Sequence, residues 1–152
     1  MDNVIFGKDG LQIFTPLDDR KLSEEKLLKK YPKIFRQKDL SMKETCMCWG
    51  LDVGIGWYWL IDMLCSRLQW DIDHNNYPQI EATQVKEKFG TLRFYTNGAN
   101  DTQEGMISLA EFMSGYICEK CGTTEGVTQT SGWVITLCKK HLKEYKEKRG
   151  NK

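Results

Sequence analysis

Three cysteines and a histidine near the C-terminus restrict the fold of this chain more than any other feature. Cys118, Cys121, Cys138 and His141 have the spacing C-x2-C-x16-C-x2-H, which is two short turns separated by a loop long enough to fold back. Zinc prefers four nitrogen or sulfur ligands in a tetrahedron, and each turn offers two. A disulfide framework is a weaker alternative, because histidine cannot join a disulfide. We therefore predict a zinc ribbon with a structural Zn²⁺, since four protein ligands leave no open position for a substrate.

Length and composition are those of one globular domain. The chain has 152 residues, of which 40% are hydrophobic and 28% charged, as in ordinary globular proteins. We expect no signal peptide, because the N-terminus lacks a basic region followed by a long apolar core. We also expect no transmembrane segment, because no apolar run approaches 18 residues. The six cysteines are then expected in a reducing cytoplasm, where thiols bind metal or stay free.

The charges are distributed unevenly along the chain. Residues 46–117 carry four basic and nine acidic side chains, a net charge of −5, whereas residues 1–45 carry +2 and residues 118–152 carry +4. A protein that binds duplex DNA usually has a basic face, and the middle of this chain would repel a phosphate backbone. Its few cations are Arg67, Lys86, Lys88 and Arg93, of which three lie within eight positions. This clustering suggests that the three cations share a role.

Three stretches have the apolar period of an α-helix. Ser23 has the side chain of an N-cap, and we expect this first helix to end near Tyr31, because Pro32 follows. From residue 57 the period predicts one buried helical face, made of Trp57, Leu60, Ile61, Leu64 and Leu68. Residues 103–117 predict another, made of Met106, Leu109, Ala110, Met113 and Ile117. Residues 1–18 have no clear period, and we expect a short strand or loop there.

The period changes to two after the turn residues 75–78, which indicates β-structure. Residues 80–88 and 91–97 predict an antiparallel hairpin around Phe89-Gly90. The fold class that follows is α+β: a small antiparallel hairpin or sheet packed by two or three helices and closed by a C-terminal zinc ribbon. We divide the chain into an α+β ligand-binding body (1–117), the zinc ribbon (118–141), packed by Trp133 and Leu137, and a basic tail (142–152) that is a short exposed helix or frayed.

The hairpin carries the candidate ligand site. Alternation places Lys86 and Lys88 on one face of the first strand, and Arg93 and Tyr95 on one face of the second. Cations beside an aromatic plane suit a phosphorylated, base-bearing ligand. The full predicted set lines a cationic hollow and consists of Arg93, Lys86, Lys88, Tyr95, Trp57 and Phe89. The alternative is an exposed strand face whose lysines only keep the protein in solution.

Other motifs leave their alternatives open. Gly54 and Gly56 precede a helix, where they could cradle an anion or form a packing turn. Cys46 and Cys48 could join Cys65 in a second metal site, but a fourth ligand is missing, and buried thiols are the default. The sequence shows no Ser/His/Asp set, no P-loop and no H-E-x-x-H motif. We therefore predict that the protein is not an enzyme.

Three segments resemble a known family. They are G-I-G-W-Y-W-L-I-D-M-L-C from Gly54, Q-V-K-E-K-F-G-T-L-R-F-Y from Gln84, and the cysteine-histidine segment from Cys118, with its G-W pair at Gly132. The chain is similar over residues 46–141 to a family of small, largely uncharacterised proteins encoded by bacteriophages and prophages. The family usually reads G-D-G-W where this chain has Ile55.

The resemblance implies a phage setting and hence the cytoplasm of a host cell. Known groups of phage proteins act as sponges that sequester nucleotide immune signals, which implies a counter-defence binding protein for a signal such as a cyclic oligonucleotide, working as a homo-oligomer. The residues keep two alternatives open: a zinc-ribbon nucleic-acid-binding module that uses the basic tail with Lys139 and Lys140, and a protein-interaction inhibitor of a host defence enzyme.

Overall fold

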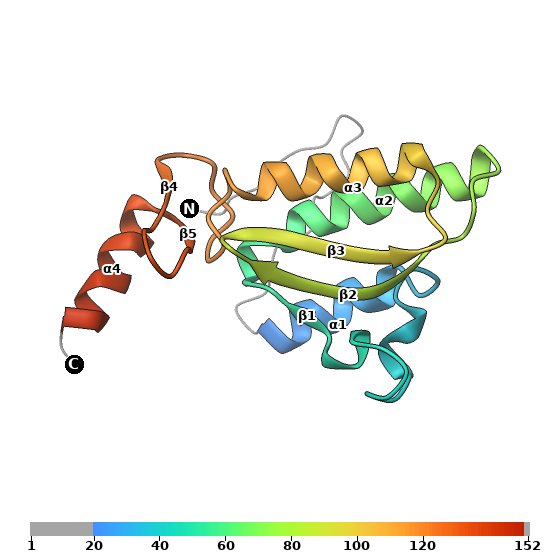
Figure 1. Cartoon of the computed structure of the whole chain (residues 1–152), viewed down its shortest axis with the longest axis horizontal. Coiled ribbons are helices and arrows are strands. Elements are labelled where there is room, and N and C mark those ends of the chain that lie inside the picture. The colour runs from blue at the N-terminus through green and yellow to red at the C-terminus, as the bar shows by residue number, and fades with distance from the viewer. Residues whose placement is uncertain (1–19, 151–152) are drawn as a thin grey trace.

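The structure, a computed structural model, describes residues 20–150 (Figure 1). Four α-helices and five short strands alternate along this part of the chain, so the predicted α+β class is confirmed. The helices are α1 (Arg20–Lys30), α2 (Tyr58–His74), α3 (Asp101–Ser114) and α4 (Lys139–Gly150). The strands are β1 (Leu51–Asp52), β2 (Glu81–Lys88), β3 (Thr91–Asn97), β4 (Val127–Gln129) and β5 (Thr136–Cys138). The strand or loop predicted for residues 1–18 lies outside the described residues.

The predicted hairpin is the centre of a three-stranded sheet with the order β1-β2-β3. Strands β2 and β3 are antiparallel, and β1 adds to β2 in parallel through Leu51 and Asp52. The hairpin turn has positive φ at both central residues, 53° at Phe89 and 78° at Gly90. Two positive φ angles are the mark of a type I′ turn, whose twist matches that of paired strands. Strand β1 was not expected, because two residues are too short to show a period.

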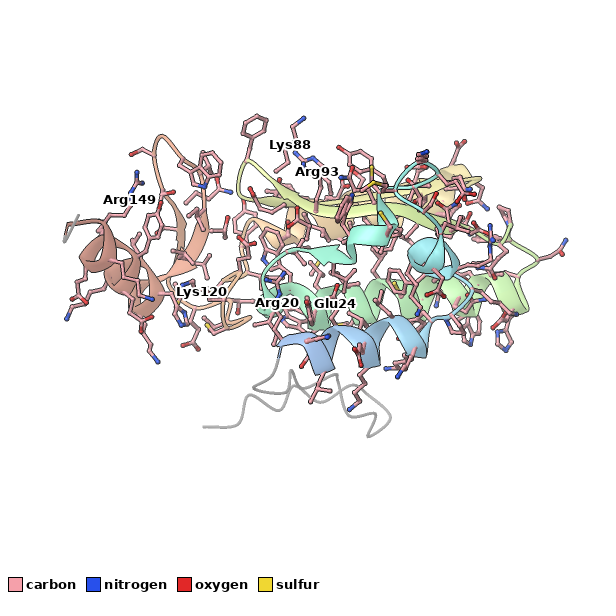
Figure 2. All side chains as sticks on the ribbon, turned by 90° about the horizontal axis from the view of Figure 1, so that it is seen from below. Arg20, Glu24, Lys88, Arg93, Lys120 and Arg149 are labelled. Carbon is pink, nitrogen blue, oxygen red and sulfur yellow. The ribbon has the colours of Figure 1, made fainter. Side chains whose placement is uncertain are left out.

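Helices cover one face of this sheet and leave the other open. In Figure 2 the sheet lies on one side of the molecule and α1 on the opposite side, with α2 between them. The predicted face of α2 is buried as expected, since Trp57, Leu60, Ile61, Leu64 and Leu68 are all at most 6% exposed. They pack with the inward residues of the hairpin, Val85, Leu92 and Phe94, in one core. The opposite hairpin face is therefore free to carry polar side chains.

Helix α1 begins earlier than predicted. Ser23 is a fully buried residue inside the helix and not its N-cap, because the helix already includes Arg20. The predicted end is confirmed, since α1 stops at Lys30, directly before Tyr31 and Pro32. Helix α1 is tied to α2 by Asp62, which pairs with Lys30 at 2.8 Å and accepts a hydrogen bond from the Tyr31 hydroxyl.

The predicted face of α3 is confirmed only in part: Ala110 and Ile117 are buried and Met106 packs against the core, but the rest of the buried side is different. Its inner side holds Gln103, Ile107, Ala110 and Ser114, whereas Leu109 and Met113 are 59% and 39% exposed. The reason is the outer edge of β3, beside which α3 runs (Figure 1). The backbone amide of Leu92 donates to Ser114 Oγ at 2.8 Å, and that of Phe94 donates to Glu111 Oε1 at 2.9 Å. Satisfying two edge amides requires polar side chains on the inner side of the helix.

The C-terminal region extends from one end of the molecule (Figure 1). It consists of the ribbon (residues 118–141), with its two-stranded β4–β5 sheet, and of α4, which overlaps the ribbon and continues it. Of the two alternatives for the basic tail, an exposed helix and a frayed end, the structure has the helix as far as Gly150. Leu137 is fully buried as expected, but Trp133 is 71% exposed and does not pack the ribbon. Trp133 lies at the tip of the loop between the two strands, where the small core beneath cannot reach it.

Within residues 20–150, no helix combines the length and apolar character that crossing a membrane requires.

Candidate functional site

The four predicted metal ligands come together in the ribbon. The ligand atoms of Cys118, Cys121, Cys138 and His141 all lie within 4.8 Å of one another. His141 Nδ1 is 3.5 Å from Cys118 Sγ and 3.3 Å from Cys138 Sγ, and the sulfurs of Cys121 and Cys138 are 3.9 Å apart. Zinc bonds to sulfur at about 2.3 Å and to nitrogen at about 2.0 Å in a tetrahedron, and such bonds bring ligand atoms to this mutual spacing. The group is therefore compatible with a metal ion such as zinc.

Local turns hold each pair of ligands. The first pair lies on a tight turn, in which the Gly122 amide donates to the Cys118 carbonyl at 2.8 Å. Gly122 has a φ of 76°, which glycine adopts without strain. In the second pair, Cys138 ends β5 and His141 lies in the first turn of α4. Burial raises the pKa of the Cys121 thiol to about 12 and lowers the pKa of His141. A metal would therefore meet a neutral imidazole and would have to displace the thiol proton.

The glycine-tryptophan motif docks the ribbon onto the body. The Gly54 amide donates to Glu119 Oε1 at 2.9 Å, and the Gly56 amide donates to the Glu119 carbonyl at 2.8 Å. A side chain at Gly56 would overlap the Cys118 carbonyl. The indole of Trp57 donates to the Ile117 carbonyl at 2.9 Å. Of the two interpretations of the two glycines, the structure supports the packing turn.

The hairpin turn makes a second contact with the ribbon. Thr136 on β5 donates its hydroxyl hydrogen to the Gly90 carbonyl at 2.5 Å and accepts from the Gln129 amide at 3.2 Å. A Cβ at Gly90 would lie 2.8 Å from Val134 Cγ1, closer than packed side chains come. Gly90 is therefore needed both for its positive φ and for this close approach. The K-F-G part of the hairpin motif thus fixes the tip of the hairpin against the ribbon.

The sheet register brings most of the predicted ligand residues onto one surface. Lys86 is directly opposite Arg93, and Lys88 is opposite Thr91. We call this surface the hairpin face, and it consists of Gln84, Lys86, Lys88, Thr91, Arg93 and Tyr95. The helices cover the other side of these strands, and Figure 2 shows Lys88 and Arg93 extending from the sheet away from α1. The sequence could not show whether Lys86 and Lys88 lie on the same side of the sheet as Arg93 and Tyr95. The strand register shows that they do.

No acidic side chain of residues 20–150 forms an ion pair with Lys86, Lys88 or Arg93. Arg93 is held along its strand, because Nη1 donates to Thr91 Oγ1 at 2.6 Å and to the Leu92 carbonyl at 2.8 Å. Cations directly opposite each other in a sheet repel, so this arrangement destabilises the unliganded hairpin. An anion bound between them would relieve the repulsion.

The predicted aromatic residues have different surroundings. Phe89 is 71% exposed at the turn, with Lys88 Nζ 5.5 Å from its ring centroid. Tyr95 is 43% exposed and lines an open groove of about 750 Å³ with Gln84 and Cys46. Trp57 is fully buried, so its ring has no surface for a ligand and we remove it from the candidate set. Its place in the helical period had already marked it as a core residue. Of the predicted set, only Tyr95 lines this groove. The groove is therefore not the predicted cationic hollow, because Lys86, Lys88, Arg93 and Phe89 are not part of its lining.

Two further hollows were not singled out in the sequence. One, of about 280 Å³, lies where body and ribbon meet and includes Arg20, Asp52, Glu87 and Glu119. Burial raises the pKa of Glu119 there, and the Gly54 amide opposes this rise. The other, of about 450 Å³, lies between β4 and α4, and we call it the ribbon groove; it is lined by Gln129, Thr130, Ser131, Leu142, Tyr145, Lys146 and Arg149. Only the basic composition of the tail hinted at the ribbon groove, because its walls come from two elements.

The three cysteines outside the ribbon do not form a group of metal ligands within the described chain. Cys65 is fully buried, and this burial raises the pKa of its thiol well above the usual value. Cys46 is exposed, and the Cys48 thiol donates to the Thr45 carbonyl at 3.2 Å. The expectation of buried thiols is therefore confirmed for Cys65 and is wrong for Cys46, which is exposed, and for Cys48, which is only partly buried.

Comparison of the chain with protein-family models, with curated proteins and with solved structures found no match. The phage family named above therefore stays a prediction, and arguments about function rest on the geometry of the chain itself.

Proposed function

We propose that this protein is a binding protein and not an enzyme, and that its hairpin face holds a phosphorylated, base-bearing ligand. In the phage setting that the resemblance implies, the ligand is a nucleotide immune signal such as a cyclic oligonucleotide, and the protein acts as a sponge that lowers its free concentration in the host cytoplasm. The zinc ion is structural and fixes the ribbon against the hairpin tip.

One observation carries the proposal: Lys86 and Arg93 are directly opposite each other, Lys88 is next to them, and no described acidic side chain pairs with any of the three. Hydrogen bonds to ionised groups are about twice as strong as neutral ones, and the planar guanidinium of Arg93 suits a phosphate. Like charges at neighbouring positions repel each other, and a phosphate ligand would offset this repulsion.

The rings support a ligand that carries bases. Phe89 and Tyr95 lie at two ends of the same cationic surface, and both are exposed. A base stacked on an aromatic ring gains about 1–3 kcal/mol. A phosphate beside the cations with its base over either ring would use both kinds of contact. An inorganic phosphate would use only the first.

The two histidines support binding rather than catalysis. His141 belongs to the metal-ligand group. His74 stacks on Trp70 with centroids 4.6 Å apart, and its Nδ1 is 2.8 Å from the Trp70 carbonyl. Neither imidazole lies on the hairpin face, where a general acid or base would have to reach a bound ligand.

The test is calorimetric titration with cyclic di- and trinucleotides, using the parent protein and Arg93→Ala. We expect the variant to lose measurable binding while its circular dichroism and zinc content stay unchanged. Lys33→Ala removes an exposed charge outside the hairpin face and serves as the control that keeps parent affinity. If Arg93→Ala binds these nucleotides as the parent does, the assignment of the hairpin face is wrong. Native mass spectrometry of protein from infected cells would report zinc, subunit number and retained nucleotide together.

A nucleic-acid-binding module is the second candidate, and α4 favours it. The helix has six basic and two acidic residues, and none of its residues is buried. A gel shift of duplex DNA that weakens steeply with salt, is lost on deletion of residues 142–152 and is unchanged in Arg93→Ala would favour this function over the first.

The homo-oligomer stays a prediction, and α3 offers the surface on which to test it. Leu109, Phe112, Met113 and Tyr116 form an exposed apolar stripe at helical spacing. Sedimentation of Phe112→Glu would show a smaller species than the parent if this stripe joins two copies.

A further inference from the structure

The ribbon groove has the side chains of a phosphate site. Its cations are Lys146 and Arg149 from α4, and opposite them are the hydroxyl of Ser131 and the amide of Gln129. Thr130 also lines the groove, but its hydroxyl already donates to the Trp133 carbonyl. No acidic residue is part of this lining. Ammonium, guanidinium, hydroxyl and amide groups are the usual donors to phosphate oxygens.

Both walls of the groove are held in place. Arg149 Nη1 donates to the Tyr145 hydroxyl at 2.9 Å, and the guanidinium carbon lies 5.5 Å from the Tyr145 ring centroid. On the other wall, Thr130 Oγ1 accepts from the Ile135 amide at 2.9 Å and donates to the Trp133 carbonyl at 2.6 Å. A ligand would therefore meet an oriented guanidinium and a fixed loop, which reduces the entropy cost of binding.

The ribbon groove and the hairpin face are neighbours. Gln129, which lines the groove, also lies beside Gly90 at the hairpin tip, as does Val134. Figure 2 shows Arg149, Lys88 and Arg93 on the same side of the molecule, opposite α1. The packing of the hairpin tip on the ribbon therefore joins two cationic surfaces into one.

Exposed rings lie at this junction. Phe89, next to Gly90, and Trp133, next to Val134, are each 71% exposed. Phe89 lies beside Lys88 of the hairpin face, and Trp133 lies in the same loop as Thr130 and Ser131 of the ribbon groove. Cations that track a backbone, with rings between them for bases, are the features of a surface that binds single-stranded nucleic acid. An acidic peptide would use the cations but would have no bases for the rings.

We infer that the ribbon groove is a second phosphate subsite and that the ligand crossing both subsites is a single-stranded oligonucleotide several nucleotides long. This inference rests on the proposed function of the hairpin face and specifies its ligand. Lys86 and Arg93 belong to the hairpin face, and Lys146 and Arg149 belong to the ribbon groove. A ligand that uses both sets of cations therefore needs more than one phosphate. A duplex fits less well, because its bases are stacked inside and cannot reach Phe89 or Trp133.

The test measures fluorescence anisotropy of labelled oligothymidylates of two, six and twelve nucleotides, and of a twelve-base-pair duplex. The groove variant is Lys146→Ala/Arg149→Ala. Its matched control, Lys143→Ala/Lys148→Ala, removes the same number of charges from the same helix but outside the groove. Circular dichroism and zinc content of both variants are compared with the parent, to show that the ribbon is intact.

We expect the parent to bind the 12-mer at least tenfold more tightly than the 2-mer, and the duplex more weakly than the 12-mer. The groove variant binds the 12-mer about tenfold more weakly, and the slope of its salt dependence falls by about 1.4, or 0.7 for each phosphate that is no longer neutralised. Its affinity for the 2-mer and for cyclic dinucleotides is unchanged. The control variant binds all probes within about twofold of the parent.

Parent-like binding of the 12-mer by the groove variant, an equal weakening in the control, or preference for the duplex would each overturn the inference. None of these results would affect the proposed function, which depends on Arg93→Ala and cyclic nucleotides. Conversely, if Arg93→Ala binds both the cyclic nucleotides and the 12-mer as the parent does, the hairpin face is not a ligand site and both proposals fail.

Discussion

The body and the ribbon differ in what holds them together. In the body, 23 buried apolar residues form one core between the sheet and its helices, whereas the second core cluster has only Cys118, Leu137 and Cys138. Two of these three are also metal ligands. The ribbon and α4 span residues 118–150, fewer than the roughly 40 residues below which a chain usually needs a metal or disulfides to fold. Apolar burial therefore stabilises the body, whereas the core of the ribbon is too small for this, and we expect the ribbon to depend on a metal held by its ligand group.

Removing the metal should have the largest effect, because it should unfold one region and leave the other folded. Chelation of zinc, or Cys138→Ser, should unfold residues 118–150 and leave the body folded, because structural zinc contributes about 10–16 kcal/mol in zinc-finger peptides. Hydrogen exchange followed by mass spectrometry would show loss of protection in β4, β5 and α4 with protection kept in β2 and α2. Cys46→Ser, which changes an exposed thiol outside the ribbon, is the control. Equal loss of protection in both regions would contradict this division.

Weakening the apolar core should destabilise the body and leave the metal site of the ribbon intact. Leu68 lies on the inner face of α2 and is 0% exposed in the core of the body. Leu68→Ala should lower the free energy of unfolding of the body by about 2–5 kcal/mol, because apolar burial is reduced and a cavity is left behind. Urea unfolding measures this decrease, and zinc content under native conditions should stay at the level of the parent. A Leu68→Ala protein that loses its zinc while the body remains folded would show that the two regions are not separately stabilised.

Docking glycines connect the two regions. A methyl group at Gly56 would overlap the carbonyl of Cys118, so Gly56→Ala should push the ribbon off the body and cost about 1–3 kcal/mol. Gly105, in α3, has no atom near the position of its Cβ, and Gly105→Ala should instead stabilise by up to about 1 kcal/mol. Thermal unfolding of both variants checks this difference in sign. A neutral Gly56→Ala would mean that the ribbon is not held at this turn.

The smallest expected effect is a pH dependence confined to the body. Arg36, then Gln37, donates hydrogen bonds to Glu81, and these lower the pKa of the carboxyl from its usual value. A carboxyl with a lowered folded-state pKa stabilises the fold above its unfolded pKa, near 4.5, and this contribution is lost as the pH falls through the folded-state value. Glu81→Gln should therefore have a slightly lower urea midpoint than the parent at pH 7 and an equal one at pH 3. A difference that persists at pH 3 would assign the effect to packing rather than charge.

Features that depend on neighbouring residues in the chain could be predicted from the sequence. The metal ligands lie in two pairs with x2 spacing, so each pair meets on a local turn. The buried face of α2 follows from its period, because apolar residues there have no competing polar role. The hairpin follows from alternation and from Gly90, which accepts the positive φ of the turn.

Features that depend on residues far away in the chain could not be predicted from the sequence. Strand β1 exists only because β2 offers it a hydrogen-bonding edge. The inner side of α3 holds Ser114 rather than Met113, because β3 amides require acceptors. The candidate site shows the same limit. The sequence identifies Lys86 and Arg93 as cations, but only the strand register shows that they lie directly opposite each other. The ribbon groove, whose walls come from β4 and α4, was not foreseen as a cavity.

Local sequence was enough to predict the secondary structure of the hairpin and of α2, and to identify four residues able to bind a metal. Packing of the whole chain was needed to learn which side of α3 is buried, that the glycine-tryptophan motif holds the ribbon, and that cations from both regions lie on one side of the molecule. The reason is the separation along the chain of the residues that interact. Turns, periods and ligand pairs are determined by residues within a few positions of one another. Edge amides, close backbone approaches and shared surfaces arise only when segments far apart in the chain have packed together.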